Sequence, residues 1–405
     1  MANRIWDTVK NIVIVLLLLS IVCLAITALP TSIVTRLSLP EKVASALGVE
    51  ASRPTLLSPG QEVTAAATPL MISLNHEGGR HTVRRDEAAL QTAYDLLSGL
   101  LGAALHSADH GKSITEAEFA EAMNAPSALF SFGGNVPAAA LCRWLTGADT
   151  AAVLSASDYL LTKDGRDVSL LVLGPTPMQY STTLSVDALL SAVSTYAPDG
   201  SSFASPESGL SPLTLWEQSV TLPMYVAENP VTADYAVRLA TDLDFNPYGT
   251  GTYTDPAGNT VFTETSRTLS VSAGGEIVIT TDGEGIARFT AADGTAAAKI
   301  ELVRSLLDTM TRGLGGQQRL QLQSMDETQC TFTYVLDGVP VAPAACRVTF
   351  RENTLAELTF SLRIYTRSAE TYRLMPLSAA AAISPAGTRL VPAISPAGGC
   401  GWTAQ

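Results

Sequence analysis

The feature that most constrains this chain is an apolar run near its start. Residues 12–29 read IVIVLLLLSIVCLAITAL and contain no charge. About 20 apolar residues in a helix cross the hydrocarbon core of a bilayer, whereas the core of a cleaved signal peptide usually has about 7 to 15 and ends at small residues. Ile26-Thr27-Ala28 fits such a cleavage pattern poorly. We therefore expect a transmembrane helix over 12–29.

The charges on either side of this run indicate its orientation. Arg4 and Lys10 precede it, and the nearest basic residues after it are Arg36 and Lys42. Basic residues close to a span favour the cytoplasmic side. We expect 1–11 to be cytoplasmic and the bulk of the chain to lie outside the cell membrane.

The expected span carries three small, weakly polar residues, Ser20, Cys23 and Thr27, at spacings that place them on one helical face. In lipid, small residues at such spacing let helices approach closely and hydrogen-bond to each other. We take these three as a membrane-helix interaction face. The alternative is that they occur there by chance, because such residues are tolerated in a span.

The charge of the chain excludes one class of partner. The sequence has 25 Lys and Arg against 38 Asp and Glu, a formal net charge of -13 at pH 7. Nucleic-acid binding needs clustered Lys and Arg, and the sequence contains no such run. We expect no nucleic-acid partner.

Composition shifts divide the rest of the chain. Prolines interrupt residues 30–67, which we expect to form a tether. Short helical and strand patterns alternate over 68–205, as expected for an extracytoplasmic α+β domain that ends in a Gly-, Ser- and Pro-rich loop. A helix followed by alternating strands then occurs twice, over 206–290 and 291–405. The expected fold class is α+β, with helices packed on antiparallel sheets and the last two units as related repeats.

The repeat is most visible in two hairpins. The stretches YTDPAGNTVFTE and YVLDGVPV pair Tyr253 with Tyr334 and Gly258 with Gly338. Each joins apolar-alternating runs across a turn, which is the pattern of a β-hairpin. Neither turn carries a His, Lys or Cys at its tip, so we expect the hairpins to present surface and not to perform chemistry.

Local sequence patterns predict where several helices and strands lie and which side chains they bury. Asp86 precedes a periodic helix with Leu90, Tyr94, Leu97 and Leu101 on one face.

Two further signals lie in the other parts of the chain. Ser113 and Glu116 have the spacing of a capping box. In the first repeat, alternation predicts that the inward side chains are Leu269, Val271, Ile277 and Ile279.

All four histidines fall within a short part of the sequence, which raises the question of a metal site. His76 and His81 flank a Gly-Gly turn, and the spacing of His106 and His110 places them on one face if the helix continues. However, a His near a helix C-terminus is also stabilised by the helix dipole, and no acidic ligand stands at motif spacing. We predict no metal site and keep these four residues as alternative candidates.

The cysteines leave two alternatives open. Cys330 and Cys346 lie symmetrically about Gly338. This arrangement is compatible with a cross-strand disulfide, and equally with two small buried thiols.

The sequence contains none of the common catalytic motifs. There is no Gly-x-Ser-x-Gly elbow, no Ser three residues before a Lys and no phosphate-binding loop, because GLGGQQ follows a helix and lacks the Lys-Ser/Thr end. We expect no catalytic residues and no cofactor.

Several of these stretches together resemble a known family. The anchor WDTVKNIVIVLLLLSIV, the segment FNPYGTGTYTDPAGNTVFTETSRTLSVSAGGEIVI and FTYVLDGVPV resemble the YycH/YycI family, membrane-anchored regulators of the WalK/WalR (YycG/YycF) two-component system. The resemblance is clearest at the anchor and over 230–405. The hairpin-containing unit is also similar to PepSY modules.

This resemblance implies regulation by contact. It implies association with a sensor histidine kinase and with a paralogous single-span regulator, through the membrane helix and the extracytoplasmic domains, and no catalytic residues. Two other hypotheses stay open. One is a PepSY-like binding module for a cell-wall polymer or a secreted peptidase, and the other is a metal-dependent envelope hydrolase that uses the histidines.

Overall fold

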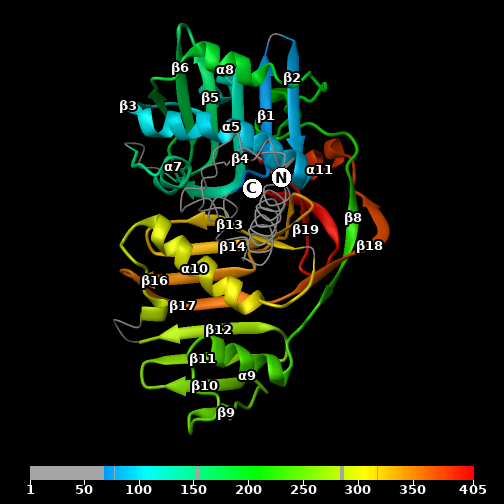
Figure 1. The fold of residues 1–405 in the computed structure, drawn as a ribbon. Helices are drawn as coiled ribbons and strands as arrows, with labels where there is room; N and C mark the ends of the chain where they lie inside the picture. Colours follow the sequence, from blue (N-terminus) through cyan, green and yellow to red (C-terminus); the bar gives the residue numbers. More distant parts are fainter. Residues whose placement is uncertain (1–67, 77, 151–154, 283–286, 317) are drawn as a thin grey trace, which may run out of the picture. The chain divides into compact units, whose positions relative to one another are not determined.

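The protein is described by a computed structural model over residues 68–76, 78–150, 155–282, 287–316 and 318–405. These residues form a mixed α+β protein with antiparallel sheets, as expected (Figure 1). All of them belong to one unit, Gly60–Gln405.

The described residues contain no helix long and apolar enough to cross a membrane. The expected span 12–29, with Ser20, Cys23 and Thr27, lies outside them, as do the cytoplasmic end and the tether.

The first sheet has seven strands in the order β2-β1-β4-β5-β6-β7-β3. Each pair of neighbours is antiparallel. The strands are β1 (Met71–His76), β2 (Gly79–Arg84), β3 (Asp109–Ser113), β4 (Ser127–Pro137), β5 (Ser155–Asp164), β6 (Asp167–Leu173) and β7 (Met178–Ser181). Successive side chains of a strand point to opposite faces. In β5 the adjacent Leu160 and Leu161 are both fully buried, so both faces of this sheet are covered.

Different elements cover the two faces. The helices α5 (Glu87–Ser107), α7 (Ala138–Thr146) and α8 (Val186–Val193) share one core with Leu161. The short helix α6 (Glu116–Ala122) buries Phe119 against the opposite face, beside Leu160. In α5 the predicted cap and face are confirmed. The Asp86 carboxylate accepts a hydrogen bond from the backbone N–H of Ala89, and the predicted apolar face is buried.

The capping box of α6 lies two residues after the predicted position. Thr115, and not Ser113, is the N-cap, and its partner is Glu118. Ser113 is unavailable because it ends β3, where it pairs with Met178. Two capping-box patterns overlap in the sequence, Ser113 with Glu116 and Thr115 with Glu118. Because Ser113 is held in β3, only the second forms.

The second sheet has nine strands and is built from two similar halves. Its main order is β13-β14-β16-β17-β12-β11-β10-β9, with β15 paired to β14. The helix α9 (Ala233–Asp242) precedes the strands β9 (Thr252–Thr254), β10 (Thr260–Glu264), β11 (Arg267–Val271) and β12 (Glu276–Thr281). The helix α10 (Ala296–Thr311) precedes β13 (Arg319–Met325), β14 (Gln329–Leu336), β15 (Val339–Pro340), β16 (Cys346–Arg351) and β17 (Thr354–Ser361).

The last strand of each half joins the two halves. β12 pairs with β17 antiparallel, with Ile279 opposite Leu358. The ranges 206–290 and 291–405 therefore share one sheet (Figure 1).

The predicted equivalence of Tyr253 and Tyr334 is wrong, because the two residues lie in strands that occupy different places in the sheet. Tyr253 lies in the edge strand β9, whereas Tyr334 lies in β14, the second strand from the other edge. The true counterpart of the β9–β10 turn is the β13–β14 turn, which places Asp255 with Asp326. One carboxylate oxygen of each Asp accepts hydrogen bonds from two backbone N–H groups that follow it. The glycine and tyrosine that looked alike belong to different turns.

The two faces of the nine-stranded sheet differ. The predicted inward residues of β11 and β12 are buried and share a core with α9 and α10. On the opposite face, Gln321, Thr333 and Val335 of β13 and β14 are buried, but in the central strands β11, β12, β16 and β17 the side chains are half-buried or exposed and mostly polar. We call this the open face; its residues in the central strands are Thr268, Ser270, Val278, Thr280, Arg347, Thr349, Glu357 and Thr359.

Two ribbons complete the described chain. β8 (Thr221–Glu228) pairs with β18 (Ile364–Arg373), and β19 (Leu390–Ile394) pairs with β20 (Cys400–Ala404). The helix α11 (Leu377–Ile383) lies between β18 and β19.

Candidate functional site

A pocket lies where the end of β2, the β14–β15 turn and the start of β19 meet. Its volume is about 80 Å³. Its charged lining residues are Arg84, Arg85, Glu217 and Arg389. Apolar side chains make up much of the remaining wall, among them Leu70, Leu213, Leu215, Val391, Pro392 and Trp402. We call it the arginine pocket.

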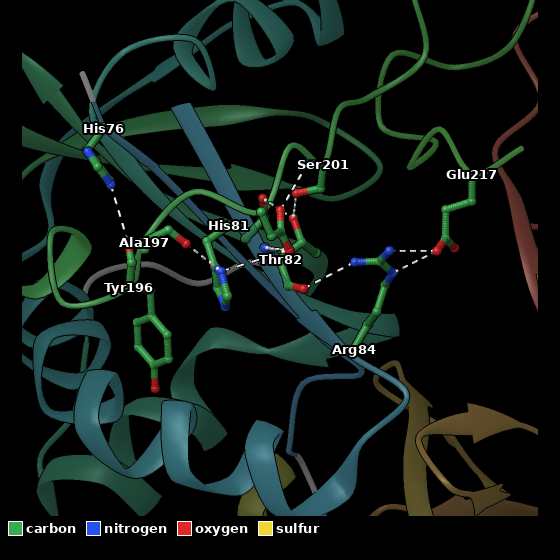
Figure 2. A network of polar contacts seen from close by, with 10 residues as sticks. His76, His81, Thr82, Arg84, Tyr196, Ala197, Ser201 and Glu217 are labelled. Atoms are coloured by element: carbon green, nitrogen blue, oxygen red, sulfur yellow. Dashed lines mark hydrogen bonds and ion pairs between the residues drawn. The ribbon is translucent and has the colours of Figure 1, made fainter. Parts of the chain in front are cut away.

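Two adjacent arginines at the end of β2 converge on one carboxylate. Arg84 donates from Nε and Nη2 to Oε1 of Glu217, at 3.0 and 2.6 Å, and Arg85 Nη2 donates to the same oxygen. Figure 2 shows Arg84 extending toward Glu217. Arg85 has a φ of 53°, which is uncommon for a residue with a side chain. The Glu217 side chain is only 11% exposed, so these contacts fix its segment against β2.

A second ion pair forms beside the pocket. Nη1 of Arg389 donates to Oδ2 of Asp158 in β5 at 2.6 Å, and Nη2 donates to Oγ of Ser131 in β4 at 2.8 Å. The Arg389 side chain is 10% exposed and that of Asp158 is 0% exposed. A buried carboxylate needs such a partner, because an isolated charge is strongly destabilised away from water.

The charges of these groups do not balance. Arg84, Arg85 and Arg389 carry three positive charges, against the two carboxylates Glu217 and Asp158. In the described chain, Nη1 of Arg85 and Nε of Arg389 are buried without a hydrogen-bond partner, as is Oδ1 of Asp158. An unsatisfied buried donor costs free energy. The pocket can therefore accept an anionic group.

The β14–β15 turn forms one wall of the pocket. Asp337 and Gly338 have φ angles of 48° and 74°, and a Cβ on Gly338 would lie 2.9 Å from Cα of Arg85. Tyr225 Oη donates to Oδ2 of Asp337 at 2.7 Å, and partial burial together with this bond raises the pKa of the tyrosine. The second of the two hairpin turns noticed in the sequence thus lies at the site. At Gly258, in the first, no atom lies near an added Cβ.

His76 and His81 both contact the loop that follows α8. His76 Nε2 donates to the carbonyl oxygen of Tyr196 at 3.3 Å, and His81 Nδ1 donates to that of Ala197 at 2.9 Å (Figure 2). The rings of His81 and Tyr196 stack with centroids 5.0 Å apart. These contacts attach the loop after α8 to the β1–β2 hairpin.

Asp199 completes this attachment. Its Oδ2 accepts a hydrogen bond from the backbone N–H of Thr82 at 3.1 Å, and its Oδ1 accepts one from that of Ser201 at 2.9 Å. Partial burial acts to raise the pKa of Asp199, but the hydrogen bonds from Ser201 and Thr82 and the nearby His81 outweigh it, so the pKa is lowered.

His106 and His110 do not share a helical face. The helix α5 ends at Ser107, and His110 lies in β3 with a φ of 49°. His106 Nδ1 donates to the carbonyl oxygen of Asp149 at 3.1 Å. In the part of the chain that the structure describes, no group of three or more His, Cys, Asp or Glu residues could hold a metal ion.

Cys330 and Cys346 are free, buried thiols. They lie in the neighbouring strands β14 and β16, but Cys330 is opposite Val348 and Cys346 is opposite Phe332. Such diagonal residues are about 7–8 Å apart, too far for a disulfide. Burial raises the pKa of both thiols.

The sequence interpretation missed the arginine pocket. Its charged residues come from the end of β2, the segment before β8 and the segment before β19, so no local spacing links them. The one available signal was Arg84-Arg85 directly after a strand pattern, which has low specificity.

Comparisons with known proteins add no relative. No protein-family model matches the chain, and no curated protein matches its sequence.

Proposed function

We propose that this protein is a non-enzymatic, single-pass membrane protein whose extracytoplasmic domains modulate a cell-envelope sensor histidine kinase by direct contact. The apolar run 12–29 supports the anchor. The resemblance to the YycH/YycI family supports the kinase and a paralogous single-span regulator as partners. The structural observation that carries the proposal is the open face of the nine-stranded sheet.

The open face forms regular rows across the strands. In one row, Thr268 is opposite Thr280, Thr280 is opposite Glu357, and Glu357 is opposite Thr349. Short side chains lose little conformational entropy when a partner covers them, and hydroxyl groups both donate and accept hydrogen bonds. A rigid polar surface of this kind suits contact with another folded domain.

A second row extends this surface to an aromatic residue at the sheet edge. It runs from Arg347 through Thr359, Val278, Ser270 and the buried Val261 to Tyr253. Tyr253 is 53% exposed, and tyrosine is enriched in protein interfaces. Tyr253 lies in β9, whose outer side is an edge available for strand pairing.

Site-specific crosslinking in the native membrane tests the proposal. A photoreactive residue at Ser270 or Thr359 should crosslink to a histidine kinase, whereas one at the exposed Gln91 of α5 should not. Equal recovery of the kinase from all three positions, or recovery from none, contradicts contact through the open face.

The membrane part needs its own experiment. Replacing Ser20 and Thr27 by Leu should lower the amount of kinase that co-purifies in detergent, if this face packs against a kinase helix. Unchanged co-purification assigns the contact to the extracytoplasmic domains alone.

A further inference from the structure

We infer that the arginine pocket binds a small organic carboxylate with a short aliphatic tail. The inference concerns a ligand of the extracytoplasmic domain, and it holds or fails independently of the kinase contact.

The charge of the pocket determines the head group of this ligand. Glu217 is shared between Arg84 and Arg85, and Asp158 is bound by Arg389. One positive charge therefore remains without a carboxylate. Arg85 lines the pocket, and in the described part of the chain its Nη1 has no hydrogen-bond partner, so this guanidinium has a donor to spare. A carboxylate supplies both the missing charge and the acceptor, and arginine binds carboxylates strongly through charge-assisted hydrogen bonds.

The walls and the volume determine the tail. Leu70, Leu215, Val391 and Trp402 line the pocket, so an apolar tail would bury surface against them. A water-sized group takes about 10–15 Å³ by the same measure of volume, so a pocket of about 80 Å³ holds roughly five to eight non-hydrogen atoms. Hexanoate is at the upper end of this range.

The pocket is also fixed before the ligand arrives. The arginine side chains are held by Glu217 and Asp158, and the Asp337-Gly338 turn is held against Arg85. A pre-organised site loses little entropy on binding, which raises affinity for a small ligand.

Calorimetry on the full chain in detergent tests the ligand class. Hexanoate should bind, and hexan-1-ol, which has the same tail without the charge, should bind at least about tenfold more weakly. Equal affinities would show an apolar pocket without anion recognition. No binding of hexanoate up to about 10 mM would also overturn the inference.

Variants locate the binding. Arg85→Gln removes the charge and leaves Glu217 bound to Arg84, so hexanoate affinity should fall at least about tenfold. The matched control is Arg143→Gln, which removes an exposed arginine paired with Asp293 and should change the affinity less than about twofold. Equal losses in both variants would contradict a specific site.

A pocket-filling variant keeps the test decisive if Arg85→Gln does not fold. Val391→Phe adds volume inside the pocket without changing its charge, and should weaken hexanoate and hexan-1-ol together. Unchanged binding of hexanoate by folded Val391→Phe overturns the inference.

N-acetylglycine, which has the same number of non-hydrogen atoms as hexanoate, identifies the source of the carboxylate. Tighter binding than hexanoate assigns the site to a peptide C-terminus, and weaker binding assigns it to a free acid.

Discussion

The two large sheets bury their side chains differently. In the seven-stranded sheet both faces are covered, one by α5, α7 and α8, and the other by α6 and the segment that carries Leu213. In the nine-stranded sheet only the face under α9 and α10 is apolar throughout. The first sheet is a closed scaffold, and the second has a face available for a partner.

The charged residues of the two sheets show the same difference. Asp158 lies in the middle of β5 and is fully buried, so the fold brings Arg389 to it from far along the chain. Glu357 in β17 is exposed and needs no such partner. A charged side chain on a covered sheet face needs an ion pair or hydrogen bonds because it is removed from water, whereas one on an open face is solvated.

The largest expected effect comes from breaking the cover of the first sheet. Arg389→Ala leaves the Asp158 carboxylate buried without its ion pair and should lower the free energy of unfolding by about 3–5 kcal/mol. Chemical denaturation measures this. A loss below about 1 kcal/mol, similar to that for the exposed Arg143→Ala, would mean that water reaches Asp158.

Alanine substitutions at adjacent positions of one strand compare the burial of the two faces in each sheet. In β5, Leu160→Ala and Leu161→Ala should each cost about 2–5 kcal/mol, because both side chains are fully buried. In β17 only Leu358→Ala should cost that much, and the neighbouring Thr359→Ala should cost less than about 1 kcal/mol. Thermal or urea unfolding distinguishes these cases. A large loss for Thr359→Ala would show that the open face is covered.

A smaller effect is expected at the start of α10, the helix that covers the second half of the nine-stranded sheet. Thr295 Oγ1 accepts a hydrogen bond from the backbone N–H of Ala298 at 3.2 Å. Thr295→Ala should lower the free energy of unfolding by about 1 kcal/mol, and Thr295→Ser should restore most of it. If Ser does not restore stability, the loss comes from the methyl group and not from the cap.

The smallest effect concerns the loop on the β1–β2 hairpin. The pKa of Asp199 is lowered from its ordinary value of 3.8, so its contribution to stability is present above that pH and is lost as the pH falls through the lower folded-state pKa. Asp199→Asn should remove this acid dependence, by less than about 1 kcal/mol because the carboxylate is partly solvated. Unfolding curves between pH 5 and pH 3 test it; identical slopes for the two proteins would contradict the assignment.

Local patterns predicted local structure well. The Asp86 cap, the apolar face of α5 and the inward residues of β11 and β12 are confirmed, because each depends on neighbours within a few residues. The position of the α6 cap was wrong because pairing of β3 with a distant strand decided between two equivalent sequences.

The features that define the candidate site depend on distant parts of the chain. The Asp158–Arg389 pair and the β12–β17 junction join residues whose spacing carries no signal. The Tyr253 and Tyr334 alignment followed residue identity, whereas strand order places Asp255 with Asp326. Hairpin turns share the same few residue types, so similar letters do not establish equivalent positions.

The β12–β17 junction limits how many copies this architecture can hold. Equivalent strands meet antiparallel, which is the intramolecular form of an isologous dimer contact, where the same surface serves both partners. Each unit therefore uses its joining edge completely in binding the other. Solenoid repeats join head to tail and can grow by further duplication. In the sheet that the structure describes, a third unit could attach only through β9 or β13, by a contact of a different kind.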